Sequence, residues 1–73
     1  MWRLFEFIVN QNCRMIGIRL QDMKTRPNLL VAAINRQGKV IIPGGQDSFE
    51  AGDSVIIVTT ETGLQDIHEI LAE

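Results

Sequence analysis

The sequence predicts an α+β domain in which four short strands form a sheet and one helix follows them. Four apolar runs of strand length are separated by glycine, proline and asparagine. Near the C-terminus, a capping-box pattern precedes an amphipathic stretch of helical spacing. A chain of 73 residues suffices for one small domain. We therefore expect a single domain over residues 1–73, in the order strand, short helix or loop, three strands, helix.

The first expected strand is Arg3 to Val9, where residues alternate between two faces. One face carries Phe5, Phe7 and Val9, and the other carries Leu4, Glu6 and Ile8. Further on, Ile16, Leu20 and Met23 are spaced by four and three residues. This spacing predicts either a short helix or a helical turn after a brief extended piece. Proline disfavours helical geometry in the preceding residue, so Arg26-Pro27 ends this element.

Two further runs, Leu29 to Asn35 and Ser54 to Thr60, are apolar on both faces, which is typical of strands covered on both sides. Between them, Arg36 to Lys39 predicts a hairpin turn, with Gly38 free to adopt a positive φ. The next strand, Lys39 to Pro43, ends at its proline because proline has no amide for a ladder.

The last expected element is a C-terminal helix. Thr62 to Gln65 fits the pattern in which a threonine is followed three residues later by glutamine. Leu64, Ile67 and Leu71 then line one side. His68 borders this stripe, and we interpret it as a packing or rim histidine, because no other metal-type residue is spaced to join it.

One helix and a helical turn cannot cover both faces of a four-stranded sheet. The face left bare would be an apolar patch of a size that is rare on monomers. We therefore expect a homodimer, in which a two-fold copy covers this face. The residues predicted to pack between the copies are Leu30, Ala32, Ile34 and Ile57.

The composition argues against several classes of partner. The net charge is −2, and the seven basic residues form no block, which excludes a nucleic-acid polymer as the main partner. Glu6 interrupts the N-terminal apolar run, so we expect no membrane insertion and no signal peptide. Cys13 is the single cysteine, so no internal disulfide forms, and we expect it to be a small buried apolar residue.

No catalytic residues emerge from the sequence, and we expect no enzyme. The glycines fit neither dinucleotide-binding nor P-loop spacing, so Gly44-Gly45 and Gly52 are better explained as strand ends and turns. Consecutive loop amides could still form an anion nest. Asp47, Glu50 and Asp53 are a weak metal candidate, for which turn formation is the better explanation.

The segment NLLVAAINRQGKVIIPGGQDSFEAGDSVIIVTTETGLQDIHEIL resembles the C-terminal domain of regulators of potassium conductance, the RCK_C or TrkA-C family. The matching features are Ile34-Asn35-Arg36 at a strand end, the Gln37-Gly38 turn, a strand ending in Pro43, and Gly52-Asp53 before Val55 to Val58. Upstream, Gly17, Leu20 and Met23 are similar to the family's Gly-x-x-Leu-x-x-Leu segment. The resemblance implies a two-layer α+β fold with a mixed sheet that commonly dimerises.

The resemblance also implies a function. It points to a cytoplasmic regulatory domain, at the inner face of the cell membrane, that senses a ligand or dimerises to control a potassium uptake transporter. The full-length protein would contact the membrane transporter subunit and carry an upstream Rossmann-type domain that binds NAD(H). This chain would be a piece of that longer protein. Some relatives bind cyclic di-AMP between two such domains, and the matching cleft here comprises Ile34, Asn35, Arg36, Ile42 and Pro43.

Two alternatives remain open. The domain could be a pure oligomerisation module without a small-molecule site. It could also be a metal-sensing regulatory domain of another cation transporter, using Asp47, Glu50 and Asp53.

Overall fold

A computed structural model describes residues 1–72 of the chain. Its four strands are β1 (Arg3–Ile8), β2 (Leu29–Arg36), β3 (Lys39–Ile41) and β4 (Ser54–Thr59). They form one sheet in the order β1-β4-β2-β3, and every neighbouring pair is antiparallel. The only helical elements in this part of the chain are two 3-10 turns, η1 (Leu20–Asp22) and η2 (Ile67–Ile70). The prediction of a mixed sheet in an α+β fold is therefore wrong.

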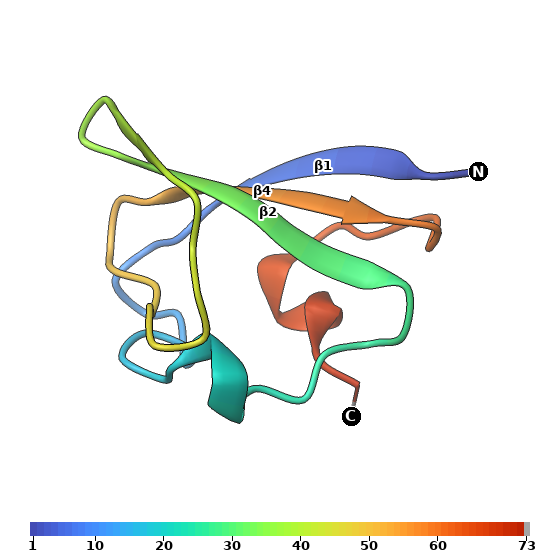
Figure 1. The fold of residues 1–73 in the computed structure, drawn as a ribbon, viewed down its shortest axis with the longest axis horizontal. Helices are drawn as coiled ribbons and strands as arrows, with labels where there is room; N and C mark the ends of the chain where they lie inside the picture. Colours follow the sequence, from blue (N-terminus) through green and yellow to red (C-terminus); the bar gives the residue numbers. More distant parts are fainter. Residues whose placement is uncertain (73) are drawn as a thin grey trace.

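The sheet has one covered and one bare face. Both 3-10 turns and the long connections lie on the same side of β1, β4 and β2, whereas no segment of residues 1–72 covers the opposite side (Figure 1). In β4, Val55, Ile57 and Thr59 are buried, and the residues between them are only half-buried. The alternation predicted for the first strand is confirmed, because Phe5 and Phe7 face the core while Leu4, Glu6 and Ile8 are exposed.

A β-bulge in β2 changes which residues face the core. Val31 is opposite Ile57, but Ala33 is opposite Ile56, so Ala32 is an additional residue in β2. Inward residues are therefore odd-numbered before the bulge and even-numbered after it, because side chains alternate with a period of two. Leu29, Val31 and Ile34 all pack in the core as a result.

The hairpin between β2 and β3 is confirmed. Ile34 pairs with Ile41, and Arg36 pairs with Lys39. The turn residues Gln37 and Gly38 have φ of 54° and 84°, the two positive values that a type I′ turn requires. The side-chain oxygen of Asn35 accepts a hydrogen bond from Gly38 N–H at 3.1 Å, which closes the turn.

Of the two interpretations of the segment after β1, the structure has the helical turn after an extended piece. Ile16 and Arg19 form isolated bridges with Phe49 and Ser48, and η1 follows directly. These bridges tie the segment to the loop between β3 and β4.

The predicted C-terminal helix is absent from residues 1–72. Gly63 has a φ of +78°, which is not helical, and the capping box forms at Asp66 and Glu69 instead of at Thr62. Helices shorter than about 12 residues are marginal without tertiary support. Here the tertiary contacts favour an extended end, because Leu71 bridges to Thr25.

The core lies between the covered face of the sheet and the connections beneath it. Cys13 is part of this core, as expected for a small apolar side chain. Its buried apolar members are Val9, Cys13, Met15, Ile34, Phe49, Val55, Ile57, Ile67 and Ile70.

Candidate functional site

The bare face of the sheet, which we call the outer face, is apolar. Its most exposed large side chains are Leu4 (67%), Ile8 (63%), Leu30 (61%) and Val40 (69%), and Ile42 (76%) follows directly after β3. Leu4 and Leu30 both pair with Val58, so an apolar row crosses three strands. Scattered exposed apolar residues are ordinary, but a contiguous row such as that of Leu4, Val58 and Leu30 marks an interaction surface.

The outer face has polar positions on one side. Glu6 accepts a hydrogen bond from the Ser54 hydroxyl of the neighbouring strand. Asn35 pairs with Ser54 and Val40 across the sheet. Hence the polar groups gather around Ser54, and the apolar residues extend from β1 across β4 to Leu30.

The structure separates the four residues predicted to pack between two copies. Leu30 is exposed on the outer face, and Ala32 is half-buried at the bulge. In contrast, Ile34 and Ile57 are fully buried at 0% exposure in the core of one copy. Their assignment to the intercopy surface is corrected. The bulge turns Ile34 inward, and Ile57 is one of the alternate residues of β4 that face the core.

Arg36 binds the loop that precedes β4. Its Nε and Nη2 donate to the two carboxylate oxygens of Asp53, each at 2.9 Å. Nη2 also donates to the Ser48 carbonyl at 2.9 Å, and Nη1 lies 3.2 Å from Glu50 Oε2. All three guanidinium nitrogens therefore have protein partners, which leaves one N–H of Nη1 for a phosphate.

Asp53 is the buried half of this ion pair. Its side chain is 1% exposed, and Oδ2 also accepts from Glu50 N–H at 2.9 Å. The hydrogen bonds from Arg36 hold the pKa of Asp53 below its usual range, against the opposing effect of burial. The same hydrogen bonds raise the pKa of Arg36. The pair thus remains ionised and fixes the loop to the end of β2.

The five residues of the predicted ligand cleft do not converge within one copy. Ile34 is in the core, Arg36 faces Asp53, and Asn35 closes the hairpin turn. Ile42 is exposed beyond β3, and Pro43 lines a separate cavity. A ligand at this cleft could not reach the buried side chain of Ile34, and a cleft formed by the other four residues stays a prediction.

The acidic candidates for a metal site have other partners. Asp47 accepts a hydrogen bond from Gly44 N–H at 2.7 Å, which closes a turn. Glu50 and Asp53 both pair with Arg36. Among the described residues, no three histidine, cysteine or carboxylate side chains are placed to hold a metal ion.

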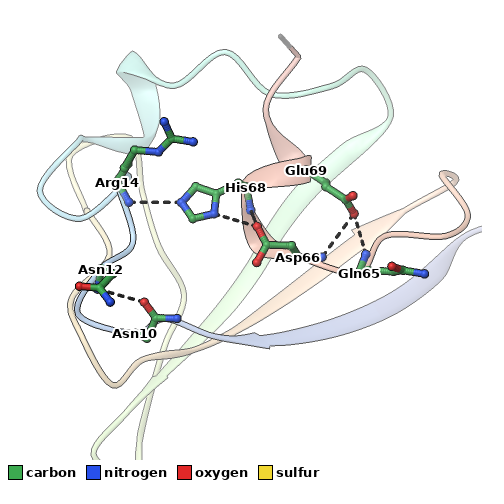
Figure 2. Close-up of polar contacts among 7 residues, drawn as sticks. All are labelled: Asn10, Asn12, Arg14, Gln65, Asp66, His68 and Glu69. Carbon is green, nitrogen blue, oxygen red and sulfur yellow. Dashed lines mark hydrogen bonds and ion pairs between the residues drawn. The ribbon is translucent and has the colours of Figure 1, made fainter.

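A polar cluster that the sequence analysis missed surrounds His68 (Figure 2). Arg14 N–H donates to Nε2 at 3.2 Å, although the two residues are 54 positions apart. Nδ1 lies 2.8 Å from Asp66 Oδ2. The two contacts fit the neutral ring with its proton on Nδ1, and the hydrogen bond from this ring lowers the pKa of Asp66. His68 therefore joins η2 to the segment after β1.

The same figure shows the capping box of η2. Glu69 Oε1 accepts from Gln65 N–H at 2.6 Å and from Asp66 N–H at 3.3 Å. This box is visible in the sequence, since aspartate at Asp66 precedes glutamate at Glu69 by three residues. A cavity of about 540 Å³ lies beside the cluster, lined in part by Arg14, Arg26 and His68.

Comparison with known proteins gives a consistent result. The model of the TrkA-C domain family matches residues 4–72. Trk system potassium uptake protein trkA homolog 1 of Methanosarcina mazei is 28% identical over 68 residues, which is 93% of this chain and 17% of that protein. Homolog 2 of the same species is 29% identical over 68 residues, 93% of this chain and 15% of its own length.

A third relative comes from another archaeon. The Trk system potassium uptake protein TrkA homolog of Pyrococcus abyssi is 26% identical over 69 residues, covering 93% of this chain and 30% of that protein. The chain thus spans between 15% and 30% of the length of these relatives. Within residues 1–72, no helix is long and apolar enough to cross a membrane.

Proposed function

The chain belongs to the TrkA-C domain family, and from this premise we propose that it is a regulatory domain of a potassium uptake system. It acts in the cytoplasm, at the inner face of the membrane, as part of a longer protein. Three relatives of the chain are named as Trk system potassium uptake proteins, which supports this assignment. The role is one of control, without catalysis.

The outer face is the observation that carries the proposal. A regulatory domain without a catalytic site acts by changing its contacts, and this surface is the part of the described chain best suited to a contact. We propose that two copies pack through it as a homodimer, with Leu4, Leu30 and Ile42 among the buried residues. Each large apolar side chain that becomes fully buried contributes about 1.5–3 kcal/mol.

The mechanism we propose is a change in the arrangement of two copies. A ligand, or a neighbouring nucleotide-binding domain that takes NAD(H), shifts the equilibrium between two arrangements through unequal affinity for them. Cyclic di-AMP is our candidate ligand, at a site between copies that includes Ile42 and Pro43. The shift would reach the transporter through the full-length protein.

Potassium uptake by cells tests this function. A host without its own uptake system would carry the whole gene, either unchanged or with Leu30→Glu and Ile42→Glu together. We expect the double variant to lose the regulated change in uptake rate while the protein stays folded. Lys39→Glu is the matched control. Lys39 is exposed on β3, but it pairs with Arg36, and both side chains lie on the side of the sheet opposite to the outer face. Normal regulation in the double variant would contradict the proposal.

Calorimetry with the isolated chain tests whether it binds the proposed ligand. Saturable binding of cyclic di-AMP, with one ligand per two chains, would support a sensor. The absence of heat with cyclic di-AMP and other cyclic dinucleotides would favour a pure oligomerisation module that passes on motion from a neighbouring domain.

A further inference from the structure

Strand β2 is paired along nearly its full length on one side and only at its C-terminal end on the other. Its β4 side is paired from Leu29 to Asn35. On the opposite side, β3 pairs only with Ile34, Asn35 and Arg36. Within residues 1–72, no strand continues the sheet beyond Leu29, Leu30 and Val31. Figure 1 shows the chain leaving the edge of β2 after the hairpin.

The alternation of hydrogen-bonded and non-hydrogen-bonded pairs between β2 and β4 shows which backbone groups of β2 point to this edge. Thr60 N–H donates to Asn28 O at 3.2 Å, and hydrogen-bonded pairs alternate along an antiparallel ladder. Leu30 is therefore hydrogen-bonded to Val58, whereas Leu29 and Val31 direct their N–H and C=O groups away from β4. In the described part of the chain, these four groups have no hydrogen-bond partner outside the strand ladders.

A cavity of about 250 Å³ lies along the same three residues. Its other walls are Leu20 and Gln21 of η1 and the loop that begins at Pro43. Gln21 N–H donates to Gly45 O and Leu20 N–H donates to Asp47 O, both at 2.9 Å. These bonds hold the loop against η1, so that it does not close onto β2.

We propose that this edge binds an extended segment of a partner polypeptide, which adds to the sheet beside Leu29 and Val31. Donors and acceptors repeat there every two residues, about 6.8 Å apart, which is the spacing of another extended backbone. The cavity takes a small apolar side chain of the segment and falls below the usual size of small-molecule sites, about 300–1,000 Å³. The segment follows the line that β3 would take if Pro43 did not end it.

The opposite edge of the sheet lacks these features. Strand β1 is also an edge strand, but no part of it lines either of the two cavities described above. Neither cavity can therefore give specificity to a segment bound at the β1 edge. The β2 edge has both the free backbone groups and a cavity for a side chain.

Amide exchange of the free chain gives the first test. We expect the amides of Leu29 and Val31 to exchange at least about tenfold faster than the amide of Leu30, which the β4 ladder protects. Equal protection of the three amides in dilute solution would overturn the proposal, because the edge would then be occupied already.

Selection from a library of short random peptides gives the second test. We expect enriched sequences that alternate apolar residues and lack proline, and whose binding slows exchange at Leu29 and Val31. Alternate backbone nitrogens of a bound peptide face β2, and those between them face away. Methylating the nitrogens that face β2 should weaken binding at least about tenfold, and methylating the other set should have little effect. Gln21→Trp, which fills the cavity from an exposed position, should abolish binding, whereas Gln11→Trp in a distant turn should not.

Three outcomes of the peptide selection would also overturn strand addition. These are a failure to enrich any peptide, peptides that leave Leu29 and Val31 unchanged, and equal sensitivity to methylation of the two sets of nitrogens. Each outcome is independent of potassium uptake, so the regulatory function and this inference can fail separately.

Discussion

Asp53 is the residue at which a small change should cost the most stability. Its buried carboxylate accepts two hydrogen bonds from Arg36 and one from Glu50 N–H, each at 2.9 Å. Asp53→Asn removes the charge and places an amide NH₂ or a weaker acceptor against the guanidinium. Breaking a buried ion pair costs about 3–5 kcal/mol. We expect the low end, because the Arg36 side chain is 27% exposed and can reach water.

This loss is large for so small a domain. Stability of about 0.05–0.15 kcal/mol per residue gives about 4–11 kcal/mol for a chain of this length. Urea unfolding followed by circular dichroism measures this loss. The change in the free energy of unfolding follows from the shift of the midpoint, provided that the dependence of the free energy on urea concentration is unchanged. Asp47→Asn is the matched control, because it weakens a single exposed hydrogen bond to Gly44 N–H and should cost less than about 1 kcal/mol.

A double variant separates the pair from its surroundings. Arg36→Met alone leaves a buried carboxylate without its cation, so the combination with Asp53→Asn should cost clearly less than the sum of the two. If Asp53→Asn is no more harmful than Asp47→Asn, the ion pair does not hold the loop, and the reasoning fails.

Three further changes follow from the same structure. Stability should fall in acid as pH drops from about 4 through the lowered pKa values of Asp53 and Asp66, and this loss should be clearly smaller in Asp53→Asn; an unchanged loss would contradict the role given to Asp53. Phe49→Ala should cost about 3–5 kcal/mol in urea unfolding, because Phe49 is fully buried, against about 0.5 kcal/mol for the control Lys39→Ala, at an exposed position off the outer face. Gly38→Ala should lower the melting temperature through a cost of about 1 kcal/mol at φ of 84°, whereas Gly44→Ala, with no positive φ, should not.

The strands could be predicted because their signals are local. Alternation in β1, the Gln37-Gly38 turn and Pro43 each act within a few residues, and the observed strands begin and end close to the expected positions. The bulge at Ala32 could not be read from the run Leu29 to Asn35, because both faces are apolar there and either parity fits. For this reason Ile34 was predicted to pack between two copies, whereas it faces the core of one copy.

The C-terminal segment contains two competing signals. Thr62 and Asp66 both begin capping-box patterns, and local sequence does not decide between them. The choice follows from contacts distant in sequence, since Arg26 N–H donates to Ile70 O and Ala72 N–H donates to Lys24 O. These contacts keep the end extended and leave room for a single 3-10 turn.

The candidate site was only partly predictable for a related reason. An uncovered apolar face follows from counting elements, and the structure has such a face. The partner of Arg36 does not follow, since Asp53 lies 17 residues away and any of several acids was equally placed in the sequence. Arg14 and His68 are farther apart still, and a single sequence carries no signal that joins them.

Sedimentation equilibrium of the isolated chain, from micromolar to millimolar concentration, tests the central claim most directly. Packing of two copies through the outer face predicts a mass twice the 8.2 kDa of one chain at the higher concentrations. Leu30→Glu with Ile42→Glu should restore the single-chain mass without loss of β-sheet signal. A wild-type chain that stays at the single-chain mass at millimolar concentration would contradict the account.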